Sequence, residues 1–247
     1  MRHLYRFFIT FFLTFSFCVN CLSFPVYGAS FQSEYSSLSV FTNSKMVVPG
    51  ESFYLVLDLK MKPGWHTYWR NPGEFGQPFV AQWDVPEGLQ IGEIQFPVPS
   101  RFVFQDTVGY GYRDQVRFLV PVYVDDGTVL PDAFDIKGQF SWLVCDDVCI
   151  SEQTDISIVF PLSNPKVMVN NLLVDDVIAS VQMTRLDSVR FEQLDKRVRF
   201  KGQLPLFNDE GWGDVSSISF FPLNMHSFLK GESFFSIDDN GSFSVDF

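Results

Sequence analysis

The sequence has few cysteines for a chain of its length. Of four cysteines in 247 residues, Cys18 and Cys21 lie within the first thirty, so only Cys145 and Cys149 remain in the rest of the chain. A chain this long can bury a sizeable core without covalent cross-links. Such sparse usage favours one specific cysteine pair over a disulfide scaffold.

Other scarcities exclude whole classes of function. The formal net charge is −11, which argues against nucleic-acid binding because that requires a basic surface. Beyond the first thirty residues only His66 and His226 are histidines, far apart in the sequence and without ligand-type neighbours. A zinc site is therefore not expected, and no other metal or cofactor is predicted. A Cys-His nucleophile pair is disfavoured as well, since the second cysteine would trap the first.

Long apolar runs are also lacking. Met1–Arg6 is basic and Phe7–Phe17 is apolar but too short for a convincing membrane span. With small residues near Gly28, this pattern predicts a signal peptide at residues 1–28 and an exported, periplasmic chain. If the signal is not cleaved, the protein is anchored to the membrane instead. No later stretch is long and apolar enough to cross a bilayer.

The chain divides into two parts by pattern. Residues 31–164 contain short apolar runs separated by Pro and Gly, of which Ser52–Leu59 and Val116–Val124 are the clearest, and this pattern predicts a β-sandwich. Residues 165–247 predict a smaller β-rich unit, which is either an incomplete sheet or one that needs a partner strand. It has one short helix, indicated by the helical spacing in Val169–Met183, and a hairpin turned at Asn240-Gly241.

The cysteine pair implies a chain reversal. Residues four apart in a continuous strand lie about 13 Å from each other, whereas bonded cysteines need Cα atoms roughly 4.4–6.8 Å apart. If Cys145 and Cys149 bond, the chain must turn at Asp146-Asp147. Carboxylates beside a thiol raise its pKa, so such a site exchanges best when a docked partner supplies the thiolate. A ring this small stabilises a fold by only about 2 kcal/mol, which favours a redox pair over a structural staple.

An aromatic stretch at Trp65–Gly73 is the other prominent feature. In an extended chain Trp65 and Trp69 face one side, whereas His66, Tyr68 and Arg70 face the other. This predicts either a polar and aromatic surface beside the thiols or an ordinary core strand. The stretch Phe102–Tyr112 is similarly aromatic and contains glycines; it predicts a mobile shielding loop or a simple hairpin.

Four motifs together resemble a known family. They are Gly64–Gly73, Gly92–Pro97, Gly109–Tyr112 and Trp142–Ile150, and in this order they are similar to the amino-terminal periplasmic domain of the DsbD/ScsB group of thiol:disulfide interchange proteins. The resemblance runs from about Phe31 to Asn164. The three residues between the cysteines match the ScsB-like branch.

The resemblance implies an immunoglobulin-like sandwich in which Cys145 and Cys149 are the redox pair. Asp146, Asp147 and Trp142 would form its surroundings. One branch of the family covers the pair with an aromatic cap loop, for which Phe102, Phe104, Val108 and Tyr110 are the candidates here. Electrons would come from a thioredoxin-like or membrane-embedded reductase and pass to a periplasmic thiol oxidoreductase. Since the sequence contains no such membrane or thioredoxin domain, the donor is expected to be another polypeptide.

The sequence thus predicts an all-β, periplasmic thiol-disulfide oxidoreductase that relays electrons through one cysteine pair. Two alternatives stay open. One is a non-catalytic periplasmic binding module with a structural disulfide, and the other is a relic that keeps the fold without its reductase.

Overall fold

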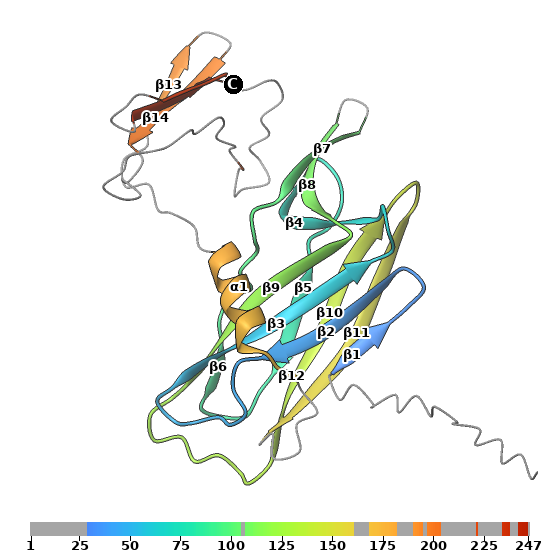
Figure 1. Ribbon diagram of the computed structural model, residues 1–247, viewed down its shortest axis with the longest axis vertical. Coiled ribbons are helices and arrows are strands. Elements are labelled where there is room, and N and C mark those ends of the chain that lie inside the picture. The colour runs from blue at the N-terminus through green and yellow to red at the C-terminus, as the bar shows by residue number, and fades with distance from the viewer. Residues whose placement is uncertain are drawn as a thin grey trace, which may run out of the picture.

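The computed structural model describes residues 29–104, 107–160, 168–181, 190–194, 197–203, 221, 234–237 and 242–246 (Figure 1). The predicted signal peptide, the predicted boundary between residues 164 and 165 and the Asn240-Gly241 turn lie outside these ranges. Within them, no helix is both long and apolar enough for a membrane span.

Two antiparallel sheets form the sandwich that the sequence predicts. The first has the order β1 (Ser30–Gln32), β2 (Ser36–Thr42), β3 (Ser52–Met61), β9 (Gln115–Val124) and β6 (Leu89–Ile91), and β12 (Met168–Val169) joins β2 in parallel. The second has the order β11 (Cys149–Phe160), β10 (Phe134–Cys145), β4 (His66–Gly73), β8 (Thr107–Arg113) and β7 (Ser100–Phe104), and β5 (Val80–Asp84) pairs with β10. The all-β, immunoglobulin-like architecture is confirmed.

The core lies between the two sheets. In β10, Ile136, Phe140, Trp142 and Val144 are buried and alternate with exposed residues, because successive side chains of a strand point to opposite faces. Large rings fill the interior: Phe79 stacks on Trp142 with centroids 5.7 Å apart and contacts Phe118 at 4.8 Å. This interior fixes which side chains of β10 and β11 face outward.

The helix α1 (Asn171–Val181) covers the outer face of the first sheet, where Figure 1 shows it crossing β3 and β9. Asn170 caps it, since its Oδ1 accepts a hydrogen bond from the backbone N–H of Leu173 at 3.0 Å. Val174 and Val177 pack on Leu119. The centre of the first sheet is therefore buried on both faces.

A third sheet has the order β13 (Arg190–Leu194), β14 (Arg197–Gln203), β16 (Ser242–Asp246) and β15 (Phe234–Ile237). β15 and β16 pair antiparallel, as the hairpin prediction requires. Phe221 packs edge-to-face on Trp69 and Tyr110 of the sandwich.

Candidate functional site

The two cysteines close the tip of a long hairpin. All twelve residues of β10 pair with β11, and Cys145 opposite Cys149 is the last pair. Their sulfurs are bonded, 2.03 Å apart. The turn is closed by a hydrogen bond from the backbone N–H of Asp146 to the carbonyl of Val148, 3.0 Å long. Asp146 and Asp147 are both exposed at this tip, where aspartates suit a tight reversal.

The two sulfurs differ in their surroundings. Cys149 is exposed because β11 is the edge strand of its sheet, whereas Cys145 is only 1% exposed. Cys145 has a second neighbour, since it also pairs with His66 of β4. The Thr67 hydroxyl fixes this junction by donating to the Leu143 carbonyl at 2.8 Å. One sulfur is thus open to an incoming group and the other is enclosed.

The disulfide lies on the outer face of the second sheet. Trp142 faces the core, where it is 2% exposed and its indole N–H donates to the Ser36 hydroxyl at 3.1 Å. By alternation, Leu143 and Cys145 then face outward. Trp142, predicted from the sequence as part of the surroundings of the cysteines, therefore supports the hairpin from the core side.

A tyrosine contacts the enclosed sulfur directly. The hydroxyl of Tyr68 donates to Cys145 Sγ at 3.3 Å, and the same oxygen lies 3.3 Å from Nε2 of His66. Burial raises the pKa of Tyr68 above its ordinary value. The pKa of His66 is lowered, first by burial and then by the Arg113 guanidinium, against a smaller opposing effect of the Asp146 carboxylate.

A loop after β4 holds Tyr68 in place. The ring of Phe75 packs edge-to-face on Tyr68 with centroids 5.9 Å apart. Gly76, at φ +91°, lies so close that a Cβ atom there would be 2.2 Å from the Tyr68 ring. A Cβ atom at Gly109 would be 2.8 Å from Phe75. Gly76 of this loop and Gly109 of the neighbouring strand β8 are therefore required for the position of the tyrosine.

The four cap candidates lie in three different places. Phe102 is buried, 5.2 Å from the His66 ring, and the Arg113 guanidinium lies 4.9 Å from its centroid. Phe104 is 67% exposed near the end of β7. Val108 and Tyr110 are buried in the core between the sheets. Phe102 thus lies on the cysteine face, and the cap assignment itself stays a prediction.

The sequence offered a polar and aromatic surface beside the thiols as one interpretation, but it did not single out Tyr68 as the neighbour of a sulfur or Phe75 as the ring that supports Tyr68. The alternation in Trp65–Arg70 was a usable signal, because it places His66 and Tyr68 on one face. Nothing in the sequence indicated Phe75, whose contact with Tyr68 depends on the course of the loop.

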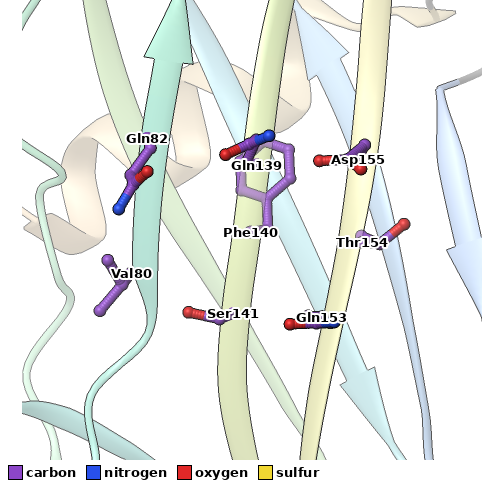
Figure 2. A pocket seen from close by; sticks show the side chains of 8 residues that line it. All are labelled: Val80, Gln82, Gln139, Phe140, Ser141, Gln153, Thr154 and Asp155. Carbon is purple, nitrogen blue, oxygen red and sulfur yellow. The ribbon is translucent and has the colours of Figure 1, made fainter.

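A polar hollow continues along the same face of the sheet (Figure 2). It has a volume of about 420 Å³ and is lined by residues of β5, β10 and β11: Val80, Gln82, Gln139, Phe140, Ser141, Gln153, Thr154 and Asp155. Gln139 pairs with Gln82 on one side and Asp155 on the other. Within the described residues, no three His, Cys, Asp or Glu side chains gather as a metal site. The hollow and the disulfide thus share the outer face of the second sheet.

Comparison with known proteins agrees with this arrangement. A family profile described as "Thiol:disulfide interchange protein DsbD, N-terminal" matches residues 36–161. The N-terminal periplasmic domain of ScsB from Proteus mirabilis has the same fold, with a TM-score of 0.55, 16% identity, and coverage of 89% of this chain and 84% of that one. The reduced N-terminal domain of DsbD from Neisseria meningitidis gives a TM-score of 0.34 at 11% identity, covering 50% and 87%. No curated protein matches the chain.

Proposed function

Because this chain belongs to the DsbD N-terminal domain family, we propose that it is a thiol:disulfide interchange protein that relays electrons through Cys145 and Cys149. The observation that carries the proposal is the pairing of an exposed sulfur with an enclosed one that already accepts a hydrogen bond. A nucleophile can reach Cys149 Sγ, and the hydrogen bond from Tyr68 stabilises the negative charge that Cys145 Sγ gains as the leaving group.

The disulfide adds little as a staple. It closes a ring that the hairpin ladder already closes, since Val144 pairs with Ile150 immediately below the cysteines. A ring of five residues contributes only about 2 kcal/mol by loop entropy in any case. A bond with so small a structural contribution is suited to reversible exchange.

In the first half of the cycle, a thiolate of the reductase attacks Cys149 Sγ. The new intermolecular S–S bond forms as the Cys145–Cys149 bond breaks, and the electron pair goes to Cys145 Sγ. The second thiolate of the reductase then attacks its own bonded sulfur and releases Cys149 as a thiolate. The reductase is oxidised to a disulfide, and this chain is reduced to a dithiol.

In the second half, the Cys149 thiolate attacks the disulfide of the acceptor and forms a second mixed disulfide. Cys145 resolves it, which restores the internal disulfide and leaves the acceptor as a dithiol. The exposed carboxylates of Asp146 and Asp147 disfavour a free thiolate on Cys149. Exchange with arbitrary oxidants is therefore slow, and a docked partner is required.

The donor in this scheme is a thioredoxin-like or membrane-embedded reductase, and the acceptor is a periplasmic thiol oxidoreductase. The proposal includes export by residues 1–28, a redox domain at 31–164 and a second β-rich unit at 165–247. In that arrangement β12 and α1, which follow residue 164, lie against the first sheet of the sandwich.

The test is to trap the mixed disulfide. Cys145→Ser, Cys149→Ser and the double variant are produced in the periplasm, and disulfide-linked adducts are separated on non-reducing gels and identified by mass. Cys145→Ser is expected to accumulate an adduct through Cys149, because the internal thiol that would displace the partner is gone. Cys149→Ser and the double variant are expected to give none. No adduct from any variant, with a parental disulfide that resists reduction, would favour the binding module with a structural disulfide.

A further inference from the structure

Three side chains form a chain of short contacts that leads away from the enclosed sulfur. It runs from Cys145 Sγ to Tyr68 Oη and on to His66 Nε2, each contact 3.3 Å long. Cys145 is 1% exposed and Tyr68 is 1% exposed, whereas His66 is only half-buried. The sulfur that leaves as a thiolate is thus connected to the surface through one hydroxyl and one imidazole.

We propose that Tyr68 is a catalytic proton donor and acceptor for Cys145 and that His66 acts through it, so that electron relay is coupled to proton transfer along this chain. The inference rests on the exchange reaction proposed above. Tyr68 and His66 then carry protons to and from Cys145 Sγ, which the two cysteines alone cannot do.

Reduction of the disulfide moves protons along this chain toward Cys145. When the Cys145–Cys149 bond breaks, Cys145 Sγ holds a negative charge in a site that water does not reach. The Tyr68 O–H proton passes to this sulfur, and the His66 Nε2–H proton passes to the Tyr68 oxygen. His66 takes up one proton from water at Nδ1. The products are a neutral thiol, a neutral phenol and a neutral imidazole in its other tautomer.

The reverse path serves the second half of the cycle. Cys145 must lose its proton before it can attack the mixed disulfide on Cys149, because the thiolate is the nucleophile. The thiol proton passes to Tyr68, the phenol proton passes to His66 Nε2, and His66 releases the Nδ1 proton to water. A phenol is a suitable intermediary because its hydroxyl both donates and accepts.

The surroundings of His66 tune this path. Arg113 of β8 is paired with His66 and opposes its protonation, whereas Asp146 at the hairpin tip favours it. Tyr68 lies beside it on β4, and the ring of Phe102 on β7 covers it. Burial and Arg113 together lower the pKa of His66, so the imidazole is neutral at neutral pH and binds a proton more readily once a thiolate forms nearby.

The test uses dithiothreitol as the reductant, so that no natural partner is needed. The rate of disulfide reduction is measured against pH and divided by the concentration of dithiothreitol thiolate. For the parent protein, this rate constant is expected to rise as the pH falls below 6.5, because protonated His66 then supplies the proton. His66→Gln keeps a hydrogen-bond donor to Tyr68 but cannot titrate, so its profile is expected to be flat.

Tyr68→Phe keeps the ring that packs on Phe75 and removes only the hydroxyl. It is expected to slow reduction about ten-fold, since a hydrogen bond to a charged group is lost, and to flatten the profile. The matched control is Tyr112→Phe, which loses a buried hydroxyl that donates to the Pro97 carbonyl at 2.7 Å in the interior. Its pH profile is expected to follow that of the parent.

A second readout is the titration of Cys145 in a reduced Cys149→Ser background, followed by thiolate absorbance. Adding Tyr68→Phe is expected to raise the pKa of Cys145 by about one pH unit. If Tyr68→Phe and His66→Gln both retain the parental pH profile, or if the titration is unchanged, the proton path is wrong. Failure of partner trapping with an intact pH effect would instead overturn the relay function and leave the proton path standing.

Discussion

Cys145 and Cys149 are bonded to each other, yet Cys149 is exposed and Cys145 is 1% exposed. The difference arises from strand order, because Cys149 lies on the edge strand and Cys145 lies between two neighbours. The two cysteines lie directly opposite each other in the strand register, but solvent and incoming reagents reach Cys149 and not Cys145.

The first prediction concerns alkylation of the two thiols. After reduction, iodoacetamide is expected to modify Cys149 at least about ten-fold faster than Cys145, because Cys149 is exposed to the reagent and Cys145 is buried. Peptide mass mapping after brief labelling measures the two rates. In concentrated urea the rates should converge. Equal rates in the folded protein would contradict the assignment of Cys149 as the attacked sulfur.

The second prediction concerns the support of Tyr68. Gly76→Ala and Gly127→Ala both place a Cβ atom on a residue of positive φ, +91° and +79°, but only the first would meet other atoms, the ring of Tyr68. Gly127→Ala is expected to cost about 1–2 kcal/mol in free energy of unfolding from backbone strain. Gly76→Ala should cost about 1–3 kcal/mol more from overpacking. Urea denaturation measures both values.

The same pair of variants also tests the site. Displacement of Tyr68 in Gly76→Ala is expected to slow reduction by dithiothreitol, whereas Gly127→Ala should leave the rate unchanged. Equal rates in the two variants would show that the loop around Gly76 does not position the tyrosine.

The third prediction concerns a buried carboxylate next to the hairpin tip. Glu152 on β11 is 7% exposed and accepts hydrogen bonds from the hydroxyls of Ser33 and Ser36, at the edge of the other sheet. Glu152→Ala leaves these donors without that acceptor and is expected to lower the free energy of unfolding by about 1–3 kcal/mol. Asp155→Ala, an exposed position on the same strand, should change it by less than about 0.5 kcal/mol. Similar losses of stability from the two variants would argue against a stabilising role for the hydrogen bonds between Glu152 and the two serines.

The fourth prediction concerns the helix after the sandwich. Val177 is 2% exposed and packs with Val56 and Leu119, whereas Leu172 on the same helix is 84% exposed. Val177→Ala is expected to destabilise the fold by about 2 kcal/mol through lost burial and a cavity. Leu172→Ala should lie within about 0.5 kcal/mol of the parent. If Val177→Ala is equally harmless, the helix contributes nothing to the stability of the sandwich.

Much of the fold follows from local pattern. Ser52–Leu59 and Val116–Val124 were predicted as strands and are β3 and β9, paired at the centre of the first sheet. The turn at Asp146-Asp147 was required by geometry if the cysteines bond, and the hairpin has that form. Spacing of apolar residues also located α1 to within two residues at each end.

The remaining features depend on long-range packing. Val56 and Leu119 are apolar on the outer face, which signals a covering element, but only the folded chain identifies that element as α1. Glu152 occupies a position that alternation assigns to the core, and no propensity predicts that two serine hydroxyls bind it there. The position of Tyr68 beside Cys145 combines a strand pairing with a loop of two positive-φ glycines, Gly73 and Gly76, and neither is visible in sequence alone.

The paired ladder below the cysteines has a consequence for the lifetime of any covalent complex. The backbone pairing of Leu143 with Ser151 and of Val144 with Ile150 does not depend on the S–S bond, so the two thiols stay opposed when it is broken. Each then experiences the other at a very high effective concentration, and ring closure competes with every intermolecular bond on Cys149. In the proposed relay, ring closure would therefore release a bound acceptor quickly as a dithiol, whereas on a bound reductase it would reverse the attack, so the reductase must resolve its own mixed disulfide faster than the ring closes.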